Sequence, residues 1–226
     1  MNEQKQKVAV VLSGCGVFDG TEIHEAVLTL LAIEEEGASW HCFAPNVEQM
    51  HVVDHTTGEV EEGAKRSVFS ESARIARGAE KLTELAEYDP MEFDAIVFPG
   101  GFGGAKNLSD FAVRGADAKV EESVTTAVHS SYAKGKPIGF ICITPASVGA
   151  LTLGGEKVEL TIGNDLDTAS QVMQCGAKHT DCSVDDVVVD LKNKVVSTPA
   201  YMLGSGLVDV RKGIAKLINE LLKLTH

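Results

Sequence analysis

Basic charge is scarce in this sequence of 226 residues, where 20 lysines and arginines stand against 33 aspartates and glutamates, for a formal net charge of −13. Binding the phosphate backbone requires cationic side chains that displace counterions, so the composition argues against nucleic acid as a partner. Long apolar runs are also missing. None approaches the roughly 20 residues that cross a bilayer as a helix, so we expect no association with a membrane.

Cysteine is too sparse and too irregularly spaced for a disulfide framework or a zinc centre. The five cysteines include no Cys-x-x-Cys pair, which favours free thiols and no bound metal. Reduced thiols indicate an intracellular compartment, and residues 1–7 contain no apolar stretch of the kind found in signal peptides. We expect a cytoplasmic protein, or one of the mitochondrial matrix if a transit peptide has been removed.

Nucleotide-binding loops are absent too. Lys106 follows a Gly-rich stretch, but it has neither the glycine spacing nor the following Ser or Thr of a phosphate-binding loop. The first strand is not followed by Gly-x-Gly-x-x-Gly either. We therefore expect no nucleotide cofactor.

What the sequence does contain is a regular alternation of buried strands and helices. Apolar runs predict strands at 7–12, 39–44, 93–98, 137–141 and 159–162, with hairpins at 50–60 and 187–197. Helical periodicity marks 21–36, 67–77, 120–134, 168–175 and 206–224, a helix starting near 145, and a further helical turn at 82–86. This pattern is typical of an α/β fold with a mostly parallel sheet covered on both faces. We expect residues 1–226 to form one domain.

Ligands of such sheets bind beyond the carboxyl ends of the strands, here the loops after residues 12, 98, 141 and 197. Cys142 follows one of these strands directly, and a helix begins near Pro145. A strand-to-helix elbow exposes the turn residue, and the helix start favours thiolate over thiol. We predict a positive φ at Cys142. The alternative is a buried cysteine that acts as a small apolar residue.

Two further segments carry polar groups to the same edge of the sheet. Gly100 and Gly101 follow a buried strand and leave backbone N–H groups free to face a pocket, as an oxyanion hole requires, although a plain Gly-rich turn is the alternative. Glu22 and Glu25 lie on one face of the first helix. Asp19 and Glu22 fit a capping box, whereas a carboxyl at Glu25 would be costly to bury without a partner.

Cys15 lies in the loop after the first strand. We predict that it lines the same pocket as Cys142, without forming a disulfide to it. The alternative is a residue that merely packs in a tight turn.

Three motifs carry a resemblance to a known family. They are SGCGVFDGTEIHEA at 13–26, FPGGFGGAKNL at 98–108 and TPAYM at 198–202. They resemble the ElbB family, also called sigma cross-reacting protein or enhancing lycopene biosynthesis protein. The wider superfamily is the class I glutamine amidotransferase-like group, with PfpI peptidases, the parkinsonism-associated deglycase and glutathione-independent glyoxalases.

The resemblance implies a flavodoxin-like three-layer sandwich, a homodimer and a nucleophile elbow at Cys142. It also implies a partner glutamate on the first helix; counting back from Gly37 favours Glu25, and Glu22 stays open. The other residues expected around the substrate are Gly100, Gly101, Ile143, Cys15, Asn107, Thr198 and Pro199. Gly101 and the N–H of Ile143 match the oxyanion-hole donors of the superfamily.

The sequence departs from two branches of that superfamily. Ile143 stands where PfpI-type peptidases carry histidine, and no downstream His-x-Glu pair of the amidotransferases is visible. We expect a cofactor-independent, glyoxalase-like enzyme that acts on small reactive aldehydes. Two alternatives remain open: a cysteine redox sensor or binding protein without catalysis, and an amidotransferase-like subunit linked to isoprenoid metabolism.

Overall fold

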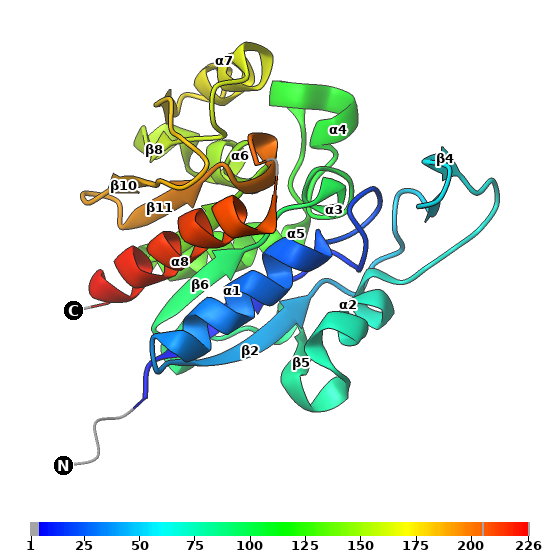
Figure 1. The fold of residues 1–226 in the computed structure, drawn as a ribbon, viewed down its shortest axis with the longest axis horizontal. Helices are drawn as coiled ribbons and strands as arrows, with labels where there is room; N and C mark the ends of the chain where they lie inside the picture. Colours follow the sequence, from blue (N-terminus) through cyan, green and yellow to red (C-terminus); the bar gives the residue numbers. More distant parts are fainter. Residues whose placement is uncertain (1–4, 205, 226) are drawn as a thin grey trace.

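A seven-stranded sheet in the order β10–β11–β7–β6–β1–β2–β5 forms the middle layer of the molecule (Figure 1). The computed structural model describes residues 5–204 and 206–225. The strands are β1 (Lys7–Val11), β2 (Ser39–Ala44), β5 (Leu82–Glu84), β6 (Ala95–Phe98), β7 (Ile138–Ile141), β10 (Val188–Asp190) and β11 (Val195–Thr198). Neighbours run parallel except β10 and β11, which form an antiparallel hairpin.

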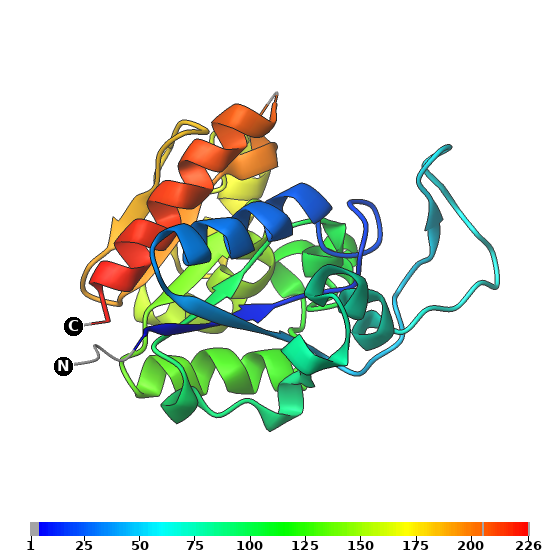
Figure 2. The same cartoon turned by 60° about the horizontal axis from the view of Figure 1, so that its bottom comes forward.

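Helices cover both faces of this sheet. One layer consists of α1 (Ile23–Glu35), α2 (Val68–Ala76) and α8 (Leu207–Lys223). The other contains α3 (Phe102–Lys106), α4 (Phe111–Arg114), α5 (Glu122–Ala133), α6 (Leu151–Leu153) and α7 (Leu166–Gln174). Figure 2 shows α1 and α8 on one side of the sheet and α5 on the other. The predicted α/β fold, a mostly parallel sheet in a flavodoxin-like sandwich, is confirmed.

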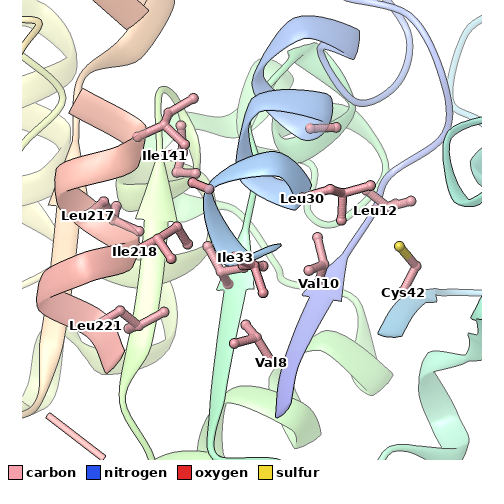
Figure 3. Close-up of a cluster of buried hydrophobic side chains, with 14 of the residues drawn as sticks. Val8, Val10, Leu12, Leu30, Ile33, Cys42, Ile141, Leu217, Ile218 and Leu221 are labelled. Atoms are coloured by element: carbon pink, nitrogen blue, oxygen red, sulfur yellow. The ribbon is translucent and has the colours of Figure 1, made fainter. Parts of the chain in front are cut away.

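The core divides between the two faces because side chains alternate along each strand. In β1, Val8 and Val10 pack in the layer of α1 and α8, while Ala9 and Val11 pack in the layer of α5. Figure 3 shows the first of these clusters, where Ile33 of α1 and Ile218 of α8 approach the sheet. Almost continuous burial of β1 explains why its sequence is an unbroken apolar run.

The chain crosses from one half of the sheet to the other after β5. It runs from β1 outward to β2 and β5, and then returns to β6 on the opposite side of β1. This is the topological switch point, where loops on the two sides diverge and leave room for a ligand. The loops after β1, β6 and β7 therefore meet at one place.

Several elements differ from the predictions. Residues 82–86 were expected to form a helical turn, but Leu82–Glu84 is the edge strand β5, too short to show a period of its own. The strand predicted at 159–162 is β8 (Glu159–Leu160), which pairs with β9 (Lys178–His179) outside the main sheet. Glycine-rich α3 and short α4 had no recognisable helical pattern.

The predicted hairpin at 50–60 is present as β3 (Val53–Asp54) and β4 (Glu59–Val60), which extend away from the body of the molecule (Figure 1). Within residues 5–204 and 206–225, no helix has the length and apolar character needed to cross a membrane.

We expect Ile218→Ala to lower the free energy of unfolding by about 2–5 kcal/mol, because it leaves a cavity in the fully buried cluster under α8. Val208→Ala, on an exposed part of the same helix, is the control and should change stability by no more than about 0.5 kcal/mol. Urea unfolding measures both. Equal effects would contradict the placement of α8.

Candidate active site

Cys142 occupies a strained elbow between β7 and the following helix. Its φ is 64°, so the predicted positive φ is confirmed. Its N–H donates to the Thr198 carbonyl at 2.9 Å, which anchors the turn to β11. The Thr144 hydroxyl accepts from the Ile141 N–H at 2.9 Å and donates to the Phe98 carbonyl at 2.8 Å. These bonds hold the elbow from both neighbouring strands, which lets a non-glycine residue keep the strained conformation.

Glu25 is the carboxylic acid beside the thiol. Its side chain is fully buried and hydrogen-bonds the Cys142 side chain. Oε2 accepts from the Gly100 N–H at 3.0 Å, and Oε1 accepts from the Tyr201 N–H at 3.1 Å. The choice of Glu25 over Glu22 as the partner of the thiol agrees with this geometry. Its burial is tolerated because both oxygens have donors.

Glu22 has a different position, at the start of α1. It is the N-cap, and its Oε2 accepts from the Glu25 N–H at 2.6 Å. The predicted capping box with Asp19 is wrong, because Glu22 caps the helix by itself. Asp19 instead accepts from the Val53 N–H at 2.8 Å, and so ties the loop after β1 to the base of the β3–β4 hairpin.

Burial is the main cause of the shifted pKa values of Glu25 and Cys142. It raises the pKa of Glu25 to about 8, against the opposing effect of the Tyr201 and Gly100 N–H groups. Burial, and then the charge of Glu25, raise the pKa of the Cys142 thiol well above its usual range. The expected preference for thiolate is therefore wrong, because desolvation outweighs the helix start. Both shifts favour the uncharged forms of the two groups.

Two backbone N–H donors oppose the rise in the pKa of the Cys142 thiol. Hydrogen bonds from the N–H groups of Gly101 and Ile143 lower the pKa of Cys142. These are the two donors that the resemblance implied. Gly101 also has a φ of 98°, and a Cβ there would lie 2.3 Å from the Glu22 nitrogen, so only glycine fits.

A cavity of about 410 Å³ opens onto Cys142. Its lining comes from the loop after β1, the start of α1, the turn into α3, the elbow, α7 and the segment after β11. The lining residues are Val17, Glu22, Gly101, Phe102, Cys142, Ile143, Thr168, Tyr201 and Met202. Apart from Glu22, these walls carry no charge and are mainly apolar.

Cys15 is not brought into this cavity. It is a free, partly buried thiol whose nearest influences are burial and then the charge of Glu71 on α2, both of which raise its pKa. Its predicted place beside Cys142 is therefore corrected, because Cys15 is not among the residues that line this cavity. The absence of a disulfide agrees with the prediction.

Three other residues expected around the substrate lie behind the cavity. Asn107 Nδ2 donates to the carbonyls of Ser13 and Asp19, and so fixes the loop after β1. The Thr198 hydroxyl donates to the Asp186 carbonyl, and Pro199 precedes the short helical turn Ala200–Met202. Gly100 does not line the cavity either, but its N–H holds Glu25. These residues position the site from outside.

Tyr201 is the main residue that the sequence reasoning missed. The preceding Ala200 has a φ of 44°, and this strained turn brings the Tyr201 N–H to Glu25. The Tyr201 hydroxyl lies 3.0 Å from Nδ1 of His24 at the cavity mouth. The TPAYM motif contains Tyr201, but a backbone hydrogen bond has no side-chain signature that could have revealed this role.

Comparisons with known proteins place the chain in a family. No protein-family model matches the sequence. The rat "ES1 protein homolog, mitochondrial" is 46% identical over 230 residues, which cover 98% of this chain and 85% of that protein. The human "Glutamine amidotransferase-like class 1 domain-containing protein 3, mitochondrial" is 46% identical over 228 residues, which cover 97% of this chain and 83% of that protein. The chain belongs to the ES1 family of amidotransferase-like proteins.

A solved structure extends the ES1 likeness to bacteria. An isoprenoid biosynthesis protein with an amidotransferase-like domain from Ehrlichia chaffeensis is 38% identical, with a TM-score of 0.88 over 96% of this chain and 99% of that chain. The resemblance to the ElbB family is thereby confirmed. DJ-1β of Drosophila melanogaster, at 14% identity and a TM-score of 0.53, shares the fold.

We expect Gly100→Ala to disrupt the site, because its Cβ would lie 2.4 Å from Cys142 Cβ and 2.5 Å from Glu25 Oε2. Overpacking of this kind costs about 1–3 kcal/mol in urea unfolding and should change the rate of Cys142 alkylation. Gly155→Ala is the matched control, because nothing lies within 4 Å of its new Cβ. Indistinguishable variants would count against this packing.

The raised pKa of Glu25 predicts a pH-dependent stability. Between the usual carboxyl pKa of 4.5 and about 8, the folded state holds a proton that the unfolded state has released. The free energy of unfolding therefore falls as pH rises through this window. Glu25→Gln should reduce that fall between pH values of about 5 and 8.5 in urea unfolding. Exposed Glu62→Gln is the control; an unchanged slope in Glu25→Gln would refute the assignment.

Proposed function

We propose that this protein is a cofactor-independent enzyme that converts small 2-oxoaldehydes, such as glyoxal and methylglyoxal, to 2-hydroxy acids. The observation that carries the proposal is the Cys142–Glu25 contact, with the Gly101 and Ile143 N–H groups directed at the sulfur. A nucleophile, a proton carrier and two oxyanion donors thus converge on a cavity. Cys142 and Glu25 are the proposed catalytic residues.

The reaction begins when the Glu25 carboxylate takes the thiol proton and the sulfur adds to the aldehyde carbon. The new C–S bond turns the aldehyde oxygen into an alkoxide, which takes the thiol proton back from Glu25 to give a hemithioacetal. Glu25 then removes the proton from this carbon and returns it to the neighbouring carbon through an enediol, while the hydroxyl proton passes from the first oxygen to the second. The product is a thioester of the 2-hydroxy acid.

Water then hydrolyses the thioester, which frees the acid and restores the thiol. The overall change adds one water to the 2-oxoaldehyde, so no external oxidant or reductant is required. The N–H groups of Gly101 and Ile143 stabilise the oxyanion formed at each addition step. Because the pKa of Glu25 is about 8, the proposed rate increases with pH up to that region as the carboxylate base forms.

The redox-sensor alternative has weaker support. It requires an accessible thiol that is ionised at neutral pH. Cys142 is only 8% exposed, and burial raises its pKa. The amidotransferase alternative rests on the name of the human relative, whereas the downstream His-x-Glu pair of that chemistry is missing from the sequence.

Location and assembly are separate proposals. The rat and human relatives are named as mitochondrial, which favours the mitochondrial matrix over the cytoplasm for this chain. The homodimer that the family resemblance implied stays a prediction, to be checked by analytical ultracentrifugation.

We expect Cys142→Ser to abolish the conversion of methylglyoxal while the fold is retained, because serine has a similar shape but is a far weaker nucleophile. Glu25→Gln should lower turnover by about 10²–10⁴-fold, since an amide cannot accept and return a proton. Cys182→Ser, which alters a free thiol outside the cavity lining, is the control and should keep wild-type activity. Product acid is measured by chromatography.

Equal turnover in the wild type and both site variants would show that the conversion does not occur at Cys142. If the wild type is inactive and dilute peroxide oxidises Cys142 selectively, the redox-sensor alternative is favoured. Release of ammonia from glutamine that depends on Cys142 would favour the amidotransferase alternative.

A further inference from the structure

The cavity at Cys142 is larger than glyoxal or methylglyoxal requires. Its volume is about 410 Å³, within the range of pockets that hold drug-sized ligands. Methylglyoxal has about five non-hydrogen atoms and would leave most of this space filled with water. A substrate that matches the cavity therefore has a sizeable group attached to its reactive carbonyls.

The lining indicates what kind of group that is. Val17, Phe102, Ile143 and Met202 present apolar side chains, and the ring of Tyr201 adds a further apolar surface. Phe102 is 49% exposed, although a phenyl ring is favoured in contact with other apolar groups. A bound apolar substituent would cover this ring and displace water from it.

The charges around the cavity exclude an anionic substituent. Glu22 is the one charged side chain among the described residues that line it, and Glu25 lies directly behind Cys142. Of the residues that the structure describes, no lysine or arginine lines the cavity. Lys106 is close to Phe102, but its ammonium donates to the Phe18 carbonyl at 2.9 Å. A phosphate or carboxylate would meet the Glu22 carboxylate, with no lysine or arginine among the described lining residues to pair with it.

We propose that the substrates of this site are uncharged 2-oxoaldehydes whose ketone carbon carries an apolar alkyl or aryl group. This inference rests on the proposed function and narrows its substrate class. The aldehyde carbon lies at the Cys142 sulfur, and the apolar group occupies the space lined by Phe102, Ile143 and Met202. Glu22 selects against substrates with a negative charge.

The test compares three substrates: methylglyoxal, phenylglyoxal and 4-carboxyphenylglyoxal. We expect kcat/KM to be about 10- to 100-fold higher for phenylglyoxal than for methylglyoxal, because burial of the ring stabilises the transition state. The 4-carboxy compound has the same ring with an added charge, so its kcat/KM should fall well below that of phenylglyoxal.

Two variants connect these preferences to residues. Phe102→Ala should reduce the ratio of kcat/KM for phenylglyoxal over methylglyoxal toward one. Phe18→Ala, a neighbouring aromatic residue outside the lining, is the control and should keep the ratio. Glu22→Gln keeps an oxygen to cap α1, and should bring the 4-carboxy compound closer to phenylglyoxal.

The outcomes distinguish failure of the proposed substrate class from failure of the proposed aldehyde-converting activity. If methylglyoxal is converted as efficiently as phenylglyoxal, and Phe102→Ala leaves the ratio unchanged, the substrate class is wrong and the aldehyde chemistry stands. If no aldehyde is converted, the proposed function fails. The preference of the cavity for an apolar group is then tested by alkylating Cys142 with bromoacetone and with 2-bromoacetophenone. Each rate is divided by the rate at which the same reagent alkylates glutathione. A preference for bromoacetone would overturn it.

Discussion

A carboxylic acid with no exposed surface, Glu25, is the constraint around which the site is organised. Burial of an unpartnered carboxyl would be prohibitively costly, so its oxygens must meet donors wherever the chain can supply them. The donors come from Gly100 after β6 and Tyr201 after β11, and the thiol comes from the elbow after β7. The parallel order that sets β6, β7 and β11 side by side, with the first turn of α1 beside their carboxyl ends, brings these groups to one point.

Close packing at that point explains two local features of the sequence. The Gly100 backbone touches both Cys142 and Glu25, and even a methyl group would displace them. The Thr144 hydroxyl connects the ends of β6 and β7, which keeps Cys142 at a φ of 64° although a β-carbon disfavours it. Burial of the apolar strands stabilises the fold. This stability offsets the cost of the strained backbone and the buried acid in the loops between the strands.

Sequence patterns were sufficient for the features that depend on local chemistry. The buried strands could be read from their apolar runs, whereas local composition left the elbow at Cys142 and the paired glycines open to a structural interpretation. The family resemblance supplied Glu25 and the donors Gly101 and Ile143. Features that depend on packing between distant segments were beyond reach. The position of Cys15 outside the cavity, the hydrogen bond from the Tyr201 backbone and the three-residue strand β5 leave no periodic or compositional signal.

The ionisation of Cys142 shows most clearly where local reasoning ends. A helix start favours thiolate, yet the surrounding apolar walls and the Glu25 carboxyl outweigh it, and the pair rests neutral. In the proposed reaction this is an advantage. The neutral pair admits an uncharged, apolar substrate without repulsion. Glu25 must then lose its proton to act as the base, and negative charge reaches the substrate oxygen only as the sulfur adds to the carbonyl. The Gly101 and Ile143 N–H groups, already fixed by the backbone, then stabilise the transition state more than the bound substrate, and that difference is what accelerates a reaction.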